Sequence, residues 1–264
     1  MAKRTEIVPA KRRALILDHL RANGAASILE LSVAIDASDS TIRRDLDHLV
    51  DQGYLERTHG GALLVQQMGT TFEREPHLNA QLRRQEKEKI GMAAAQRLRD
   101  GDSVIFESSS TVFETARAAS GRNLSLTVIT NSLDIAQFAT GVQNWNVIVP
   151  GGTVRQGSQF LAGELVMSFF RELHVDVLIA GAWAVSATAA TDASLEVASI
   201  KRAMVASARK TILVADSSKF SELGFCNFCK ISQVHELITD SGIDPETVER
   251  ISAANTKVST VRVN

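Results

Sequence analysis

The stretch SDSTIRRDLDHLVDQGYLERTHGG, residues 38–61, combines a helical pattern, two adjacent arginines and a pair of glycines. At 100° per residue, its apolar side chains fall on one arc and predict the buried side of a helix over about 39–53. Those side chains are Ile42, Leu46, Leu49 and Val50. Hydroxyl and guanidinium groups occupy the first turns, and carboxylates follow further along. A helix that enters the major groove by its N-terminal end brings only its first turns to the bases, so this gradient favours DNA recognition.

The side chains expected to face DNA lie at the start of this helix and in the segment after it. Arginine donates bidentate hydrogen bonds to guanine or binds phosphate, and Asp47 is spaced to orient both Arg43 and Arg44. The run YLERT-HGG-ALLV predicts two strands joined by a tight turn, with Gly60 and Gly61 free to adopt positive φ. The candidate DNA-binding residues are Ser38, Ser40, Thr41, Arg43, Arg44, Arg57 and His59. The alternative is a solvated helix whose surface ion pairs contribute little.

Two more helices are predicted before this stretch. PAKRRALILDHLRANG is bounded by Pro9 and Gly24, and SILELSVAI follows Ser27, which is a plausible N-cap. Their apolar residues at helical spacing are Ile16, Leu17, Leu20, Ile28, Leu31 and Ile35. Residues 1–64 contain nine Lys/Arg and nine Asp/Glu, so any case for DNA binding depends on where the charges lie and not on their sum.

The rest of the chain predicts a second, larger domain of the α/β class. Apolar runs alternate with helical stretches from residue 103 onward, which is typical of a mostly parallel sheet covered by helices. The runs are SVIFE, LTVIT, NVIVPGG, VDVLIAGA, TILVAD and HELITD. We therefore expect a first domain over 1–65, a linker over 66–80 and the α/β domain over 81–264.

Polar clusters follow several of the predicted strands. The carboxyl ends of parallel strands line the ligand crevice of such a sheet, and hydroxyls at a helix start suit an anion. The candidates from this pattern are Ser108, Ser109, Ser110, Thr111, Thr130, Asn131, Gly151, Gly152, Arg155 and Lys219. Together they indicate a phosphorylated small molecule, although each feature alone also occurs as an ordinary N-cap, turn or surface residue.

Composition sets further limits. The chain has 264 residues, 44% hydrophobic residues and a net charge of −1, which is typical of an ordinary globular protein. Neither a secretory signal nor a membrane span is predicted, so we expect a cytoplasmic protein. Cys226 and Cys229 form a C-x-x-C without the further ligands that zinc needs, and they are interpreted as structural or incidental thiols. We expect no cofactor and no metal.

STIRRDLDHLVDQGYLERTHGGALL closely resembles the signature of the DeoR family of bacterial transcription regulators. Weaker motifs follow in the family's order: TNS (130–132), PGGTVR (150–155), IKRAM (200–204), ADSSKF (215–220) and ELITD (236–240). The resemblance implies a winged helix-turn-helix with 38–52 as the reading helix. It also implies a Rossmann-like sensor domain similar to the sugar-phosphate isomerase and CoA-transferase fold, a homo-oligomer (dimer or tetramer) and Lys201 as a further effector-binding residue.

Members of this family typically bind phosphorylated sugars or sugar alcohols. This sequence departs from the family pattern at three places. Where the family has Asp-Ser-Gly-Thr-Thr, this sequence has Glu107-Ser108-Ser109-Ser110-Thr111. Where the family has Asp-Gly, it has Trp183-Ala184, and Val197 replaces an acidic residue. The departures leave two alternatives open: an unusual effector, or a pocket that has lost its typical ligand.

The leading hypothesis is therefore a regulator that binds double-stranded operator DNA, a repressor of a carbohydrate catabolic operon relieved by a phosphorylated sugar or sugar alcohol. A second hypothesis is a sugar-phosphate isomerase with an N-terminal appendage, in which Glu107 or Asp216 would act as the base. A third is a scaffold whose first domain binds protein.

Overall fold

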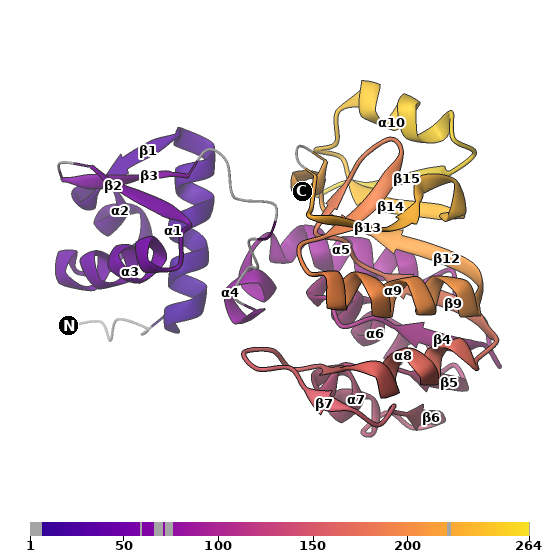
Figure 1. The fold of residues 1–264 in the computed structure, drawn as a ribbon. Coiled ribbons are helices and arrows are strands. Elements are labelled where there is room, and N and C mark those ends of the chain that lie inside the picture. Colours follow the sequence, from indigo (N-terminus) through magenta and orange to yellow (C-terminus); the bar gives the residue numbers. More distant parts are fainter. Residues whose placement is uncertain (1–6, 59, 66–70, 72–75, 221–222, 264) are drawn as a thin grey trace. The chain divides into compact units, whose positions relative to one another are not determined.

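The computed structural model describes residues 7–58, 60–65, 71, 76–220 and 223–263, and it divides the chain into two compact units (Figure 1). The first unit is Met1–Arg84 and the second is Gln85–Asn264. Among the candidate DNA-binding residues, His59 lies outside the described residues.

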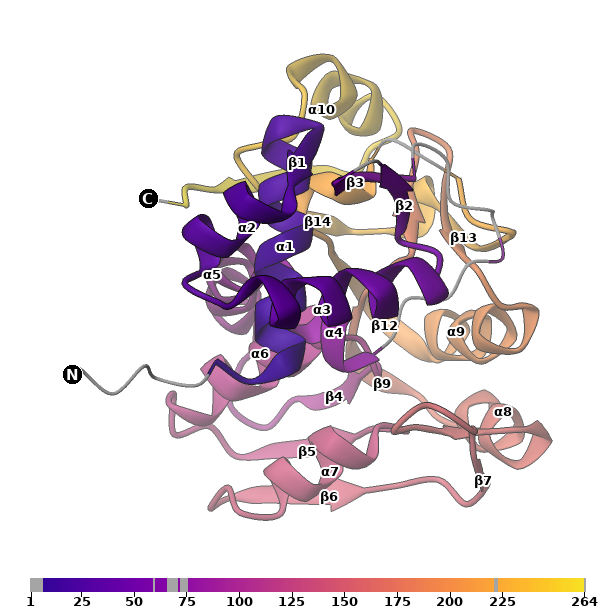
Figure 2. The ribbon, with the colours of Figure 1, turned by 90° about the vertical axis from the view of Figure 1, so that its left-hand side faces the viewer.

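The N-terminal part of the first unit, up to Leu64, contains three helices and a small sheet, as expected of a winged helix-turn-helix. The helices are α1 (Pro9–Asn23), α2 (Ile28–Ile35) and α3 (Asp39–Asp51), and the strands are β1 (Ala25–Ser27), β2 (Leu55–Thr58) and β3 (Gly61–Leu64). β2 follows directly after the C-terminal end of α3 (Figure 2). Ser27 caps α2 in a reciprocal capping box with Glu30, which confirms its predicted role.

The core of this unit contains the apolar residues that the helical spacing predicts. The predicted apolar side chains that are at most 5% exposed are Ile16, Leu17, Leu20, Ile28, Leu31, Ile35, Ile42, Leu46 and Leu49. Val50 is only partly buried and packs at the edge of the same cluster. The amphipathic pattern thus fixes which side of α3 faces inward.

The two glycines after β2 have different roles. Gly60 adopts φ 94°, as predicted for the turn. Gly61 does not adopt the positive φ that is also expected of it. It is required for space, because a Cβ there would lie 2.2 Å from the Ala26 carbonyl oxygen. This close approach accompanies the antiparallel pairing of β3 with β1, a strand that the sequence does not predict.

α4 (Pro76–Gln81) belongs to the first unit, where it contacts α1. Leu78 and Leu82 are buried in the same core as α1 because α4 turns its apolar side toward that helix. The sequence-based division instead places 66–80 in a linker and begins the second domain at residue 81. The compact unit extends further, to Arg84.

The second unit is built on a seven-stranded sheet whose strands are all parallel, as the alternating pattern predicts. The strands are β4 (Ser103–Phe106), β5 (Leu126–Ile129), β6 (Trp145–Ile148), β9 (Val175–Ala180), β12 (Ala208–Val214), β14 (Glu236–Asp240) and β15 (Lys257–Val261). Their order is β15-β14-β12-β9-β4-β5-β6. The chain runs outward from β4 to β6, returns to β9, and then runs outward on the other side, so the topological switch point lies between β4 and β9.

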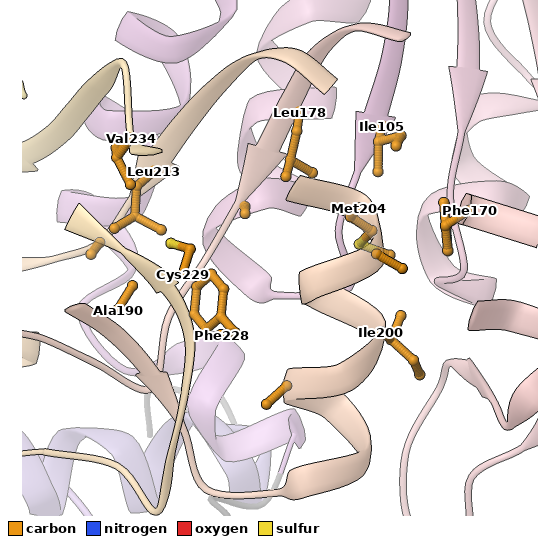
Figure 3. Packing of buried hydrophobic residues seen from close by; sticks show 14 of the residues in the cluster. Ile105, Phe170, Leu178, Ala190, Ile200, Met204, Leu213, Phe228, Cys229 and Val234 are labelled. Carbon is orange, nitrogen blue, oxygen red and sulfur yellow. The ribbon is translucent and has the colours of Figure 1, made fainter. Parts of the chain in front are cut away.

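Helices cover both faces of this sheet. The helices are α5 (Arg84–Ala95), α6 (Ser110–Ser120), α7 (Leu133–Ala139), α8 (Glu164–Arg171), α9 (Leu195–Ser207) and α10 (Pro245–Ser252). α5, α6 and α7 share one apolar cluster with the sheet, and α8 and α9 share the other. In the second cluster, Ile200 and Met204 of α9 lie near Phe170 of α8 (Figure 3).

The second unit also contains two smaller antiparallel sheets. β7 (Thr153–Val154) pairs with β8 (Leu161–Ala162), and β10 (Ala184–Val185), β11 (Ala189–Asp192) and β13 (Cys226–Lys230) form a separate three-stranded sheet. Phe228 and Cys229 of β13 join the α8–α9 cluster (Figure 3). The C-x-x-C motif therefore lies on a strand, and both of its thiols are free.

Candidate DNA-binding surface and effector site

The first turn of α3 is held by Ser38, whose Oγ accepts a hydrogen bond from the Thr41 N–H at 3.3 Å. The same oxygen lies 3.0 Å from Ser40 Oγ and 2.8 Å from Thr41 Oγ1. Ser38 and Ser40 are exposed and Thr41 is half-buried. Three hydroxyls thus lie together at the N-terminal end of the helix, where its dipole and free N–H groups favour a negatively charged partner.

Arg43 and Arg44 are both exposed on the next turn. Within the described part of the chain, neither guanidinium forms a side-chain hydrogen bond or ion pair. The expectation that Asp47 orients these two arginines is wrong. Asp47 pairs instead with Arg57 of β2, which leaves Arg43 and Arg44 available to a ligand.

Arg57 lies on β2 and contacts α3 in two ways. Its Nη2 donates to Asp47 Oδ1 and also to the backbone oxygen of Arg43, the latter at 3.2 Å. Its side chain is 33% exposed and that of Asp47 is 62% exposed. Arg57 is therefore beside the candidate DNA-facing turns, but it is engaged by the helix.

Asp45 is one of the carboxylates that follow the arginines of the helix, and the sequence pattern does not predict its burial. It is only 2% exposed. Arg12 binds it through Nε and through Nη2, the latter at 3.3 Å, and Arg13 Nε donates to it at 3.1 Å. The helical wheel misses this contact because the partners come from α1, more than thirty residues earlier in the chain.

In the second unit, the switch point is occupied by a buried group of charges. Glu107 follows β4, and its Oε2 accepts the N–H groups of Ser109 at 3.0 Å and Gly181 at 3.1 Å. Lys201 Nζ lies 3.3 Å from Glu107 Oε1, 2.8 Å from Asp192 Oδ2 and 3.0 Å from the Gly181 oxygen. One buried ammonium thus joins the loops after β4 and β9 to the strand β11 and the helix α9.

Lys201 is 4% exposed, and all three of its protons have acceptors from the protein. Burial by itself lowers the pKa of Lys201, but the attraction of Asp192 and Glu107 outweighs it and raises the pKa above its ordinary value. The ammonium therefore stays charged and paired. This geometry favours a role for Lys201 in positioning the loops over direct contact with an effector.

Two buried polar atoms follow neighbouring strands without a hydrogen-bond partner among the described residues, Ser109 Oγ and Asn131 Oδ1. Ser109 is the N-cap of α6, yet its side chain caps none of the first-turn N–H groups, which have no partner inside the helix. Asn131 is 2% exposed and its amide nitrogen donates to the Leu161 oxygen at 3.0 Å. Both oxygens lie at the carboxyl edge of the sheet, where they can form hydrogen bonds with a bound group.

The other sequence-based candidates are divided between structural contacts and exposed positions. Thr130 is fully buried, and its Oγ1 accepts the Ser132 N–H at 3.0 Å. Arg155 lies 3.3 Å from Glu196 of α9. Lys219 is 9% exposed at the end of a short helix after β12. Ser108 and Ser110 are half-buried, Thr111 is buried, and Gly151 and Gly152 are exposed.

The two carboxylates considered as catalytic bases are both committed to the protein. Glu107 is held by Lys201 and two backbone N–H groups. Asp216 Oδ1 accepts hydrogen bonds from the backbone and the hydroxyl of Ser218. A general base needs a free lone pair directed at the substrate proton, so these contacts do not favour the isomerase hypothesis.

Burial raises the pKa of both C-x-x-C thiols, that of Cys229 to about 11, which is the property of inert structural cysteines. In the described ranges, no set of three or more His, Cys, Asp or Glu side chains is placed to hold a metal ion. No helix of those ranges has the length and apolarity needed to cross a bilayer.

Comparison with known proteins agrees with this arrangement. Residues 12–68 match the family model of the DeoR-like helix-turn-helix domain, and residues 82–241 match that of the DeoR C terminal sensor domain. The HTH-type transcriptional repressor GlcR of Bacillus subtilis is 31% identical over 87% of this chain and 88% of its own length. The transcriptional repressor AccR of Agrobacterium fabrum is 33% identical over 88% of this chain and 89% of its own length.

Among solved structures, ribose 5-phosphate isomerase A of Methanocaldococcus jannaschii covers 51% of this chain and 53% of its own, with a TM-score of 0.39 and 17% identity. A likeness of this size supports no shared activity. The relatives in sequence are named as regulators and repressors, which supports a regulator and not an enzyme. From both family matches and these relatives, the chain belongs to the DeoR family of DNA-binding, helix-turn-helix transcriptional regulators.

Proposed function

We propose that this regulator represses a carbohydrate catabolic operon and that a phosphorylated sugar or sugar alcohol relieves the repression. The repressor names of GlcR and AccR support the first part. The observation that carries the second part is the pair of buried, unpartnered oxygens, Ser109 Oγ and Asn131 Oδ1, after adjacent strands of the sheet.

In this proposal the phosphate binds at the first turn of α6. The N–H groups there lack a side-chain cap, and the hydroxyls of Ser110 and Thr111 lie on the same turn. Asn131, Gly151 and Gly152 would contact the rest of the molecule, and Arg155 and Lys219 would add positive charge. Lys201 would act indirectly, by holding the loops after β4 and β9 in place.

DNA recognition would use α3 from each of two subunits, since half-sites one helical turn apart require a symmetric dimer or a tetramer. The DNA-facing residues proposed are Ser38, Ser40, Thr41, Arg43 and Arg44. The effector releases DNA only if it binds the DNA-free state better than the DNA-bound state.

The test is a gel shift of the promoter regions beside the gene, repeated with a panel of phosphorylated sugars, sugar alcohols and inorganic phosphate. One phosphorylated compound should release the DNA, whereas inorganic phosphate should be much weaker. Ser109→Ala should weaken the binding of that compound by roughly threefold to tenfold. The free variant should be at least as stable as the wild-type protein, because an unpaired buried hydroxyl is removed.

Ser120→Ala is the matched control, since this half-buried serine lies at the other end of α6, where its hydroxyl donates to the Arg117 oxygen at 2.8 Å. The effector site would be wrong if no phosphorylated compound releases the DNA, or if the two serine variants respond alike.

A further inference from the structure

The reading helix α3 is acidic by itself. Its thirteen residues, DSTIRRDLDHLVD, contain four aspartates and two arginines, a net charge of −2. DNA is a polyanion, so uncompensated carboxylates on this helix oppose its approach. The structure shows how two of these carboxylates, the two nearest Arg43 and Arg44 in sequence, are neutralised by other elements.

Asp45 is compensated from α1. Arg12 and Arg13 both bind it. The side chain of Arg12 is 13% exposed, that of Arg13 is 22% exposed and that of Asp45 is 3% exposed. The pair of arginines leaves this buried group with a net positive charge. It is part of the packing between α1 and α3.

Asp47 is compensated from the wing. It is exposed on the same side of the helix as Arg43 and Arg44, and Arg57 of β2 binds it. The second bond from Arg57, to the backbone oxygen of Arg43, fixes the guanidinium against the turn that carries the free arginines. With Arg12, Arg13 and Arg57 included, five arginines face four aspartates and the net charge becomes +1.

We propose that Arg57 is a positioning residue, which supports DNA binding by neutralising Asp47 and not by contacting a phosphate. This differs from the direct DNA contact expected from its place in the hairpin. If Arg57 acts on Asp47, then removing Asp47 makes Arg57 dispensable. If Arg57 binds phosphate, its loss cannot be corrected by any change at Asp47.

The experiment measures the affinity of the full chain for a duplex enriched from a random-sequence library by the wild-type protein, over a range of salt concentrations. Arg57→Ala should weaken DNA binding roughly fivefold at low salt. This is the factor expected from the repulsion, through water, between the unpaired Asp47 carboxylate and a DNA phosphate. Asp47→Asn should bind at least as tightly as wild type. The double variant Arg57→Ala/Asp47→Asn should return to within about twofold of wild type.

Arg171→Ala and Glu164→Gln serve as matched controls, because this exposed ion pair lies on α8 of the second unit. They should leave affinity unchanged. Arg57→Lys keeps the charge and should stay near wild type. All measurements are made without effector, so they do not depend on the proposed ligand.

Three results would overturn the proposal. The double variant could bind as weakly as Arg57→Ala, with the slope of log affinity against log salt reduced by about one in both, which is the mark of a lost phosphate contact. Arg57→Ala could bind like wild type. Asp47→Asn could be as weak as Arg57→Ala, which would mean that the pair matters only as a structural link.

Discussion

In each unit, buried charged side chains connect elements that are distant in the sequence. Asp45 joins α1 to α3 through Arg12 and Arg13, and Lys201 joins the loops at the switch point. A third such residue, Glu236, lies at the start of β14. Arg97 donates to its Oε1 at 3.0 and 2.8 Å, and Ser259 does so at 2.8 Å. Removing one partner of such a group leaves a buried charge uncompensated, which costs more than the pair itself contributes.

Glu236 makes the stability of the second unit depend on acid. Burial alone raises the pKa of this carboxyl, but hydrogen bonds from Arg97, Ser259 and Lys257 outweigh it and lower the pKa from 4.5 to about 2. The folded state therefore gains stability that is complete above pH 4.5 and is lost as the pH falls toward 2.

Urea unfolding of Glu236→Gln at several pH values tests this dependence. The variant should be less stable than wild type at neutral pH, and the difference should shrink as the pH falls below 4.5. Glu164→Gln, at an exposed ion pair on α8, should show no such convergence. A constant difference between Glu236→Gln and wild type at every pH would contradict the assigned pKa.

Residue patterns in the sequence predict much of the candidate site, but not its internal pairing. Ser38, Arg43 and Arg44 follow from helical periodicity, since exposure on a helix depends on local spacing. The partners of Asp45 and Asp47 do not, because α1 and β2 bring Arg12 and Arg57 from distant parts of the chain. Lys201 likewise carries no local sign that its partners come from β4 and β11.

At the scale of elements, long apolar runs predict strands and short ones do not. β4, β5, β9, β12 and β14 lie in the runs that the sequence marks as buried. β15 (KVSTV) is a half-exposed edge strand with only two strongly apolar residues, and β1 has three residues. β1 exists because β3 pairs with it, which is a tertiary effect that composition does not reveal.

The pairing of β1 with β3 gives a prediction for the wing. Gly61→Ala would place a Cβ 2.2 Å from the Ala26 oxygen and 2.9 Å from the Ser27 Cα, both of them backbone atoms. β3 must then move away from β1, with a loss of stability in the first unit of about 1–3 kcal/mol. Hydrogen exchange should speed up over β1 and β3 and remain unchanged over the sheet of the second unit.

Gly60→Ala gives a useful comparison, because its Cβ would meet nothing within 4 Å and its cost arises only from φ 94°. If Gly61→Ala exchanges no faster than wild type, the close approach of β3 to β1 is not needed for the wing.

At the scale of the whole molecule, two units carry two tasks. The first presents Arg43 and Arg44, whose guanidinium groups have no partner among the described residues, near the start of an exposed helix, and the second gathers polar loops at the switch point of a parallel sheet. The change from a helical pattern to alternating strands and helices predicts this division. In the structure, each unit has its own apolar core. The place of α4 could not be predicted, since its six residues are too few for a periodic signal and Leu78 and Leu82 are buried through contact with α1.

The most direct test of DNA reading by α3 is the affinity of Arg44→Ala for the selected duplex and for a scrambled duplex, measured by fluorescence anisotropy at several salt concentrations. We expect the variant to lose about tenfold or more on the selected duplex, with a smaller loss on the scrambled one, because a base contact is removed together with a charge. Unchanged discrimination between the two duplexes in Arg44→Ala, or equal binding of both by the wild-type protein, would contradict it.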